Sequence, residues 1–147
     1  MKDGNSVCLD QDVCPGTAWK PLFHKCYFFN ETVQSADESI AFCGTMDAKL
    51  VRIDNASVQA FLQTEMINRG MNLVWIAAND RDVEGEWVWG PGDEVTEARW
   101  YDGEPNNTNN EDCCVIRKAD GLWLDLKCET TKFNQRAVCQ RQYKLLL

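Results

Sequence analysis

Eight cysteines, spread along 147 residues without a Cys-x-x-Cys pair, constrain this chain more than any other feature. They are Cys8, Cys14, Cys26, Cys43, Cys113, Cys114, Cys128 and Cys139. With His24 as the one histidine, a Cys/His zinc site and a catalytic dyad that needs histidine are both disfavoured. An even number of dispersed cysteines is typical of disulfides, which form in an oxidising compartment. The cysteines therefore predict an exported protein.

Length and charge restrict the class of protein further. A chain of 147 residues fits one ordinary domain, and its net charge of −8 disfavours nucleic acid or an anionic membrane as the main partner. The acidic excess is compatible with a soluble surface or a cation site. No stretch approaches the ~20 apolar residues of a membrane span. Because polar residues follow Met1, we expect a mature or recombinant fragment from which a signal sequence was removed. Within the given chain we expect a loose N-terminal leader segment over 1–13, a domain over 14–142 and a C-terminal tail over 143–147.

Hydrophobic periodicity and turn residues predict an α+β fold. A hairpin is expected between Cys14 and Phe29, stapled by a Cys14–Cys26 bridge. One helix is expected over 36–46, and a second begins at Asn55 or Ser57 and stops at Gly70. The apolar positions of these helices are Ile40, Phe42, Cys43 and Met46, then Val58, Phe61, Leu62, Met66 and Ile67. Short strands are predicted over 49–53, 73–77, 113–116, 122–126 and 137–139.

A long region between the strands at 73–77 and 113–116 has weak periodicity and is rich in oxygen-bearing side chains. A compact domain rarely carries so long an irregular region without a function. Its candidate ligands, with one later residue, are Asp80, Glu84, Glu104, Asn106, Asn107, Glu111, Asp112 and Asp125. Calcium takes 6–8 oxygen ligands, so converging loops could bind it, whereas an acidic surface without an ion is the alternative. Pro105 could adopt a cis peptide that turns Glu104 and Asn106 to one side.

Several motifs, in this order, resemble the C-type lectin-like domains of the long form over about residues 14–141. They are Cys14 through Trp19 to Cys26-Tyr27, Trp75-Ile76-Ala77-Ala78, Glu104-Pro105-Asn106, and Trp123-Leu124-Asp125 where the family usually has Trp-Asn-Asp. The resemblance implies the C-type lectin fold, with two helices, small antiparallel sheets and a long calcium-stabilised loop region. It also implies the disulfides Cys43–Cys139 and Cys113–Cys128.

The resemblance further implies two Ca2+ sites. The sugar-linked ion would bind Glu104, Asn106, Glu111 and Asp125, and the auxiliary ion would bind Asp80, Glu84, Asn107, Glu111 and Asp112. In the family, two vicinal sugar hydroxyls complete the shell of the first ion. Glu-Pro-Asn rather than Gln-Pro-Asp implies glycans with equatorial 3,4-diols, of the mannose, N-acetylglucosamine (GlcNAc) or fucose type. The implied protein is secreted or the extracellular part of a cell-surface protein.

Two departures from the family pattern weaken these implications. Leu124 replaces an asparagine that gives calcium an oxygen and the sugar an NH₂, and leucine supplies neither. Asn107 stands where aspartate is common, so the auxiliary site loses one negative charge. One alternative is a C-type lectin-like domain that has lost sugar binding and binds a protein. Another is a domain that binds a non-carbohydrate surface, as an ice-binding protein does. Glu104 and Glu111 could pair as in glycosidases, but neither has a hydrophobic setting in the sequence, so we expect no enzyme.

Cysteines and asparagines outside these sites leave further questions. Cys8 and Cys114 could pair with each other, link a homodimer or stay reduced, and a Cys8-linked dimer is slightly favoured. N-glycosylation sequons begin at Asn30, Asn55 and Asn106, and we expect Asn106 to be unmodified because it lies in the predicted ion-ordered loop. We expect four tryptophans to lie in the hydrophobic core rather than to form a platform for sugars: Trp87, Trp89, Trp100 and Trp123.

Overall fold

The computed structural model describes residues 14–107 and 110–142, and it contains two helices and nine strands within them. The predicted leader, the predicted tail and Cys8 lie outside the described residues. The helices are α1 (Ala36–Gly44) and α2 (Ala56–Arg69). The strands are β1 (Trp19–Leu22), β2 (Lys25–Asn30), β3 (Lys49–Leu50), β4 (Leu73–Asn79), β5 (Val88–Gly90), β6 (Asp93–Glu94), β7 (Cys113–Arg117), β8 (Trp123–Leu126) and β9 (Gln135–Gln142).

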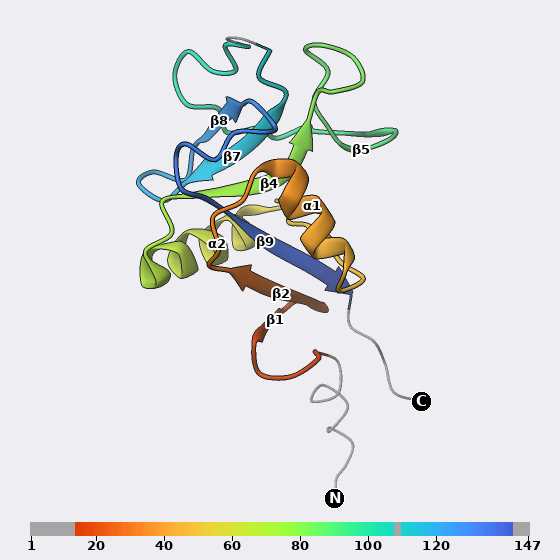
Figure 1. Ribbon diagram of the computed structural model, residues 1–147, viewed down its shortest axis with the longest axis vertical. Helices are drawn as coiled ribbons and strands as arrows, with labels where there is room; N and C mark the ends of the chain where they lie inside the picture. Colours follow the sequence, from red (N-terminus) through yellow and green to blue (C-terminus); the bar gives the residue numbers. More distant parts are fainter. Residues whose placement is uncertain (1–13, 108–109, 143–147) are drawn as a thin grey trace, which may run out of the picture.

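One sheet connects all nine strands, in the order β1-β2-β9-β4-β5-β6, with β3 paired to β9 and β7 paired to both β4 and β8. Every pairing is antiparallel except β4 with β9, which is parallel. In Figure 1 the helices flank the middle of this sheet, while β7, β8 and the long irregular loops gather at one end. The loop region thus lies at one end of the sheet, where Arg81 still contacts Asp37 of α1.

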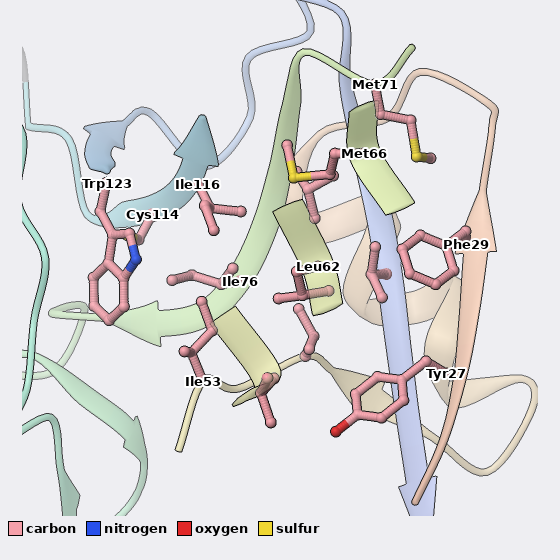
Figure 2. Packing of buried hydrophobic residues seen from close by; sticks show 14 of the residues in the cluster. Tyr27, Phe29, Ile53, Leu62, Met66, Met71, Ile76, Cys114, Ile116 and Trp123 are labelled. Atoms are coloured by element: carbon pink, nitrogen blue, oxygen red, sulfur yellow. The ribbon is translucent and has the colours of Figure 1, made fainter. Parts of the chain in front are cut away.

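Two apolar clusters occupy opposite faces of the central strands, as the alternation of side chains along a strand requires. Along β4, Val74 and Ile76 belong to one cluster and Trp75 to the other. The first cluster includes Leu62, which has no exposed surface and lies near the centre of the group in Figure 2. The second includes Cys43 of α1. Each helix therefore covers its own face of the sheet.

Both helices begin and end at residues suited to those positions. Ser35 and Glu38 form a reciprocal capping box at the start of α1. Asn55 caps α2 by accepting from the Val58 amide, so Asn55 and not Ser57 is the cap, and Gly70 ends the helix with a positive φ of 69°. The prediction that Ile40 and Ile67 lie on the buried faces of the helices was wrong, because Ile40 is 49% exposed and Ile67 is 58% exposed. Each helix needs only a narrow stripe against the sheet, so these residues lie beyond its edge.

The strand predictions were right in place and less accurate in length. The expected strand at 49–53 is only Lys49–Leu50, because Val51 turns to receive the Ala77 amide while donating to Val138. The last strand runs from Gln135 to Gln142 and is longer than predicted. The short strands β5 and β6 were not predicted at all, since they pair inside the irregular region.

The three predicted disulfides are present: Cys14–Cys26, Cys43–Cys139 and Cys113–Cys128. The second joins α1 to β9 across 96 residues, and closing a loop of this size stabilises the folded state by up to about 4.7 kcal/mol in the chain-entropy model. Cys114 is a free thiol with no exposed surface, so a dimer link through Cys114 does not fit this fold. In the described part of the chain, neither helix has the length and apolar character needed to cross a membrane.

Candidate calcium site

Three carboxylates from separated segments meet at the loop end of the domain. One oxygen each from Glu104, Glu111 and Asp125 lies within 4.8 Å of the other two, and we call these residues the first carboxylate cluster. Asp125 is 2% exposed because β8 carries it against β7, whereas Glu104 and Glu111 are half-buried on the loop before β7. The cluster brings together three of the four residues predicted for the sugar-linked ion.

Asn106, the fourth predicted ligand, is part of the same arrangement. The Glu104–Pro105 peptide is cis, as the sequence suggested, and the Asn106 side-chain amide donates to Glu104 Oε2 at 3.0 Å. The backbone N–H groups of Asn106 and Asn107 donate to Oδ1 and Oδ2 of Asp125, at 3.1 and 2.7 Å. A carboxylate has about four lone-pair sites, so Asp125 keeps capacity for another partner.

Electrostatics in the first carboxylate cluster oppose ionisation. Burial, and then the neighbouring Asp125 carboxylate, raise the pKa of Glu104 to about 7. The same two causes, in the same order, raise the pKa of Glu111. Partly buried like charges at this distance repel one another, and a divalent cation between them would relieve that repulsion.

An orphaned oxygen shows that the cluster is suited to a cation. Glu104 Oε1 is buried and has no hydrogen-bond partner among the described residues. Leaving a buried polar atom unpaired costs about 1–3 kcal/mol, more for a charged one. Carboxylate and amide oxygens are the ligands that calcium prefers, so the residues present fit this ion.

A second carboxylate cluster consists of Asp80, Glu84 and Asp112, again with one oxygen from each within 4.8 Å of the others. Asp80 Oδ2 accepts the Gly85 amide at 2.8 Å, while Asp80 Oδ1 and Asp112 Oδ1 are buried without a partner in the described chain. Burial is the first cause that raises the pKa of Asp80 and of Asp112. Two orphaned oxygens in one cluster again suit a hard cation.

The structure brings together only some of the residues predicted for the auxiliary ion. Asp80, Glu84 and Asp112 meet as predicted. Glu111 instead joins the first carboxylate cluster, and the backbone N–H of Asn107 donates to Asp125. Sequence inspection missed the backbone amides that hold the carboxylates, since every residue except proline carries one. Gly85 was the detectable signal for one of these backbone donors, because a glycine directly after Glu84 favours a turn there.

Leu124 supplies no oxygen to the first carboxylate cluster. It is half-buried and packs against the apolar cluster that includes Cys113 and Leu126. The position that departs from the family pattern is thus occupied by an apolar contact.

Four tryptophans link the loop region to the core, as predicted. Trp123 is fully buried, and Trp87, Trp89 and Trp100 pack partly buried against its cluster. The ring centroids are 4.8 Å apart for Trp87 and Trp100, 5.8 Å for Trp100 and Trp123, and 5.7 Å for Trp89 and Trp123. Edge-to-face pairs of this kind contribute about 0.5–1.5 kcal/mol each beyond the area they bury.

Comparison with known proteins agrees with the fold and the motifs. A family model described as the lectin C-type domain matches residues 32–141. Human C-type lectin domain family 17, member A, is 35% identical over 129 residues, covering 88% of this chain and 32% of that protein. The mouse low affinity immunoglobulin epsilon Fc receptor is 32% identical over 119 residues, covering 81% of this chain and 35% of the receptor.

A solved structure of a C-type lectin domain has the same fold as this chain. The cow C-type carbohydrate-recognition domain of CD23, in the presence of a GlcNAc2Man3 oligosaccharide, superposes with a TM-score of 0.80 at 28% identity, covering 90% of this chain and 98% of that one. The α+β fold and its carboxylate-bearing loops define a C-type lectin-like binding domain, a class without enzymatic activity. The chain belongs to the C-type lectin family. It spans only about a third of the length of the two curated relatives.

Proposed function

We propose that this domain binds carbohydrate through calcium, with a preference for sugars that carry equatorial 3,4-diols, such as mannose, GlcNAc or fucose. The observation that carries the proposal is the convergence of Glu104, Glu111 and Asp125, with an orphaned buried oxygen on Glu104. The Asn106 side chain lies beside this cluster, with its Nδ2 donating to Glu104 Oε2. The ion would be held by these residues and would supply open positions for two sugar hydroxyls. Three disulfides support a secreted or cell-surface location.

Retention on mannose-agarose, with calcium and then with EDTA, tests this function. We expect the protein to be retained in calcium and released by chelation. Glu111→Gln should abolish retention, since it removes one carboxylate from the first carboxylate cluster. Glu129→Gln is the matched control, because Glu129 is exposed and lies outside both clusters. Retention of Glu111→Gln equal to that of the control would refute the proposed ligation.

Sugar preference can be tested within the same cluster. Glu104→Gln combined with Asn106→Asp reverses which of the two side chains carries the amide, and in the family this pattern accompanies galactose-type ligands. We expect the double variant to lose binding to mannose and gain binding to galactose on immobilised sugars. A double variant that still prefers mannose would show that these two residues do not select the sugar.

A second function, binding of a protein ligand, is favoured by one observation. Leu124 replaces a polar residue and turns its side chain into an apolar contact, so the first carboxylate cluster has one oxygen fewer for calcium and one donor fewer for a sugar. One relative in this family is named as an immunoglobulin receptor. A glycan array that stays blank in calcium, with a normal calcium-dependent melting shift, would favour protein binding over sugar binding.

A further inference from the structure

Three N-glycosylation sequons occur in the sequence, and the structure distinguishes between them. Asn30-Glu31-Thr32 and Asn55-Ala56-Ser57 lie wholly within the described residues. The third begins at Asn106, whose side chain bonds to Glu104 in the candidate calcium site, and it ends at Thr108, outside the described residues. The comparison that the structure allows is therefore between Asn30 and Asn55.

Asn30 has both ends of its amide engaged in a buried position. It is 9% exposed at the end of β2. Its Nδ2 donates to Gln34 Oε1 at 3.1 Å, and its Oδ1 accepts the Thr32 amide at 3.2 Å. An oligosaccharide attached to Nδ2 would need space where the folded chain places Gln34, so a glycan at Asn30 would oppose folding.

Asn55 has the opposite surroundings. Asn55, Ala56 and Ser57 are all exposed, and the Asn55 backbone is extended, with φ −160° and ψ 175°. Its Oδ1 accepts the Val58 amide at 3.0 Å, while its Nδ2 makes no hydrogen bond to another described residue. The nitrogen that a glycan would occupy is therefore accessible, and the oxygen that caps α2 is a different atom.

We propose that Asn55 carries an N-linked oligosaccharide. In the transfer, a bond forms between Asn55 Nδ2 and C1 of the first sugar, and the bond from that C1 to a polyprenyl-diphosphate carrier breaks. The diphosphate leaves with the electron pair, and the proton lost from Nδ2 passes to a base of the transferase. The product amide keeps its carbonyl Oδ1, so Asn55 caps α2 and bears the glycan at once.

This modification is independent of calcium and of sugar recognition, because Asn55 belongs to neither carboxylate cluster. It requires only that the chain pass through a compartment containing the transferase, which the three disulfides favour. A failure of mannose binding would leave the modification intact, and the reverse also holds.

The test is to secrete the full chain from a eukaryotic cell line that performs N-glycosylation. Peptide N-glycosidase converts an occupied asparagine to aspartate, and mass spectrometry of the peptides then locates it. We expect that conversion at Asn55 in the wild-type protein. An unconverted Asn55 in the secreted protein would overturn the proposal without the need for any variant.

Two variants separate the glycan from the helix cap. Asn55→Asp removes the acceptor nitrogen but keeps an oxygen for the Val58 amide, and Ser57→Ala breaks the sequon without changing Asn55. Each should lose the glycosidase-sensitive gel shift, while Asn30→Gln should keep it. After deglycosylation, Ser57→Ala should melt with the wild type, whereas Asn55→Ala should melt lower because it also loses the cap. A shift of unchanged size in both Asn55→Asp and Ser57→Ala would place the glycan elsewhere and refute the assignment.

Discussion

The backbone N–H of Asn106 donates to Oδ1 of Asp125 at 3.1 Å, although 19 residues separate them in the chain. Asp125 belongs to the sheet and is fixed by β8, whereas Asn106 lies on the long loop. This bond, and its neighbour from Asn107, tie the loop that carries Glu104 to a rigid strand. The same carboxylate therefore positions the loop and takes part in the first carboxylate cluster.

Calcium should stabilise the folded protein through this arrangement. A ligand at 100 times its Kd adds about 2.7 kcal/mol, which for a domain of this size raises Tm by about 5–10 °C. We expect that rise in differential scanning fluorimetry, and its loss on adding EDTA. Asp125→Asn should remove most of it, while Asp102→Asn, an exposed loop residue, should not. An identical melt with calcium and with EDTA would count against both clusters as ion sites.

Leu124→Asn should strengthen sugar binding. The new amide restores one hydrogen-bonding group at the site, worth about 1 kcal/mol or a five-fold lower Kd. The folded state should lose about 1–2 kcal/mol at the same time, because Leu124 is half-buried against an apolar cluster. Leu124→Ala separates the effects, since it loses the packing without gaining an amide. Calorimetric titration with mannose measures the affinity, and equal Kd values for the two variants would contradict the prediction.

Calcium affinity should fall at acidic pH. Burial and Asp125 raise the pKa of Glu104 from 4.5 to about 7, so the ion-free folded state holds a proton there that the unfolded chain has lost. Stability of the ion-free protein therefore falls as pH rises from 4.5 to about 7, and calcium must displace that proton below about pH 7. The calcium-induced rise in Tm should be smaller at about pH 5.5 than at about pH 7.5. Equal rises at the two pH values would show that Glu104 is not protonated in the ion-free state.

The two faces of α2 should respond differently to truncation. Leu62 has no exposed surface, and Leu62→Ala should cost about 2–5 kcal/mol through lost burial and a cavity. Ile67 on the same helix is 58% exposed, so Ile67→Ala should change the free energy of unfolding by less than about 0.5 kcal/mol. Urea denaturation of the two variants measures both values. A large loss for Ile67→Ala would indicate that a partner or another copy covers that face.

Much of the fold could be predicted because its signals are local. The Asn55 cap and the Gly70 stop lie next to the helix that they bound, and the alternation along β4 is visible in seven residues. The long region without periodicity was also correctly recognised as a separate loop region. Strand ends, the pairing of β5 with β6 and the exposure of Ile40 could not be predicted in this way, because they depend on distant segments.

The sequence by itself determined the chemistry: which residues carry carboxylates, which cysteines are available to bond, and where three sequons stand. Only the tertiary structure decided how that chemistry is distributed. It brought Glu104 and Asp125 together, placed the Cys114 thiol in the core, and buried Asn30 while exposing Asn55. The physical reason is that burial and charge repulsion depend on distances through space. Residues far apart in the chain acquire those distances only when the sheet forms.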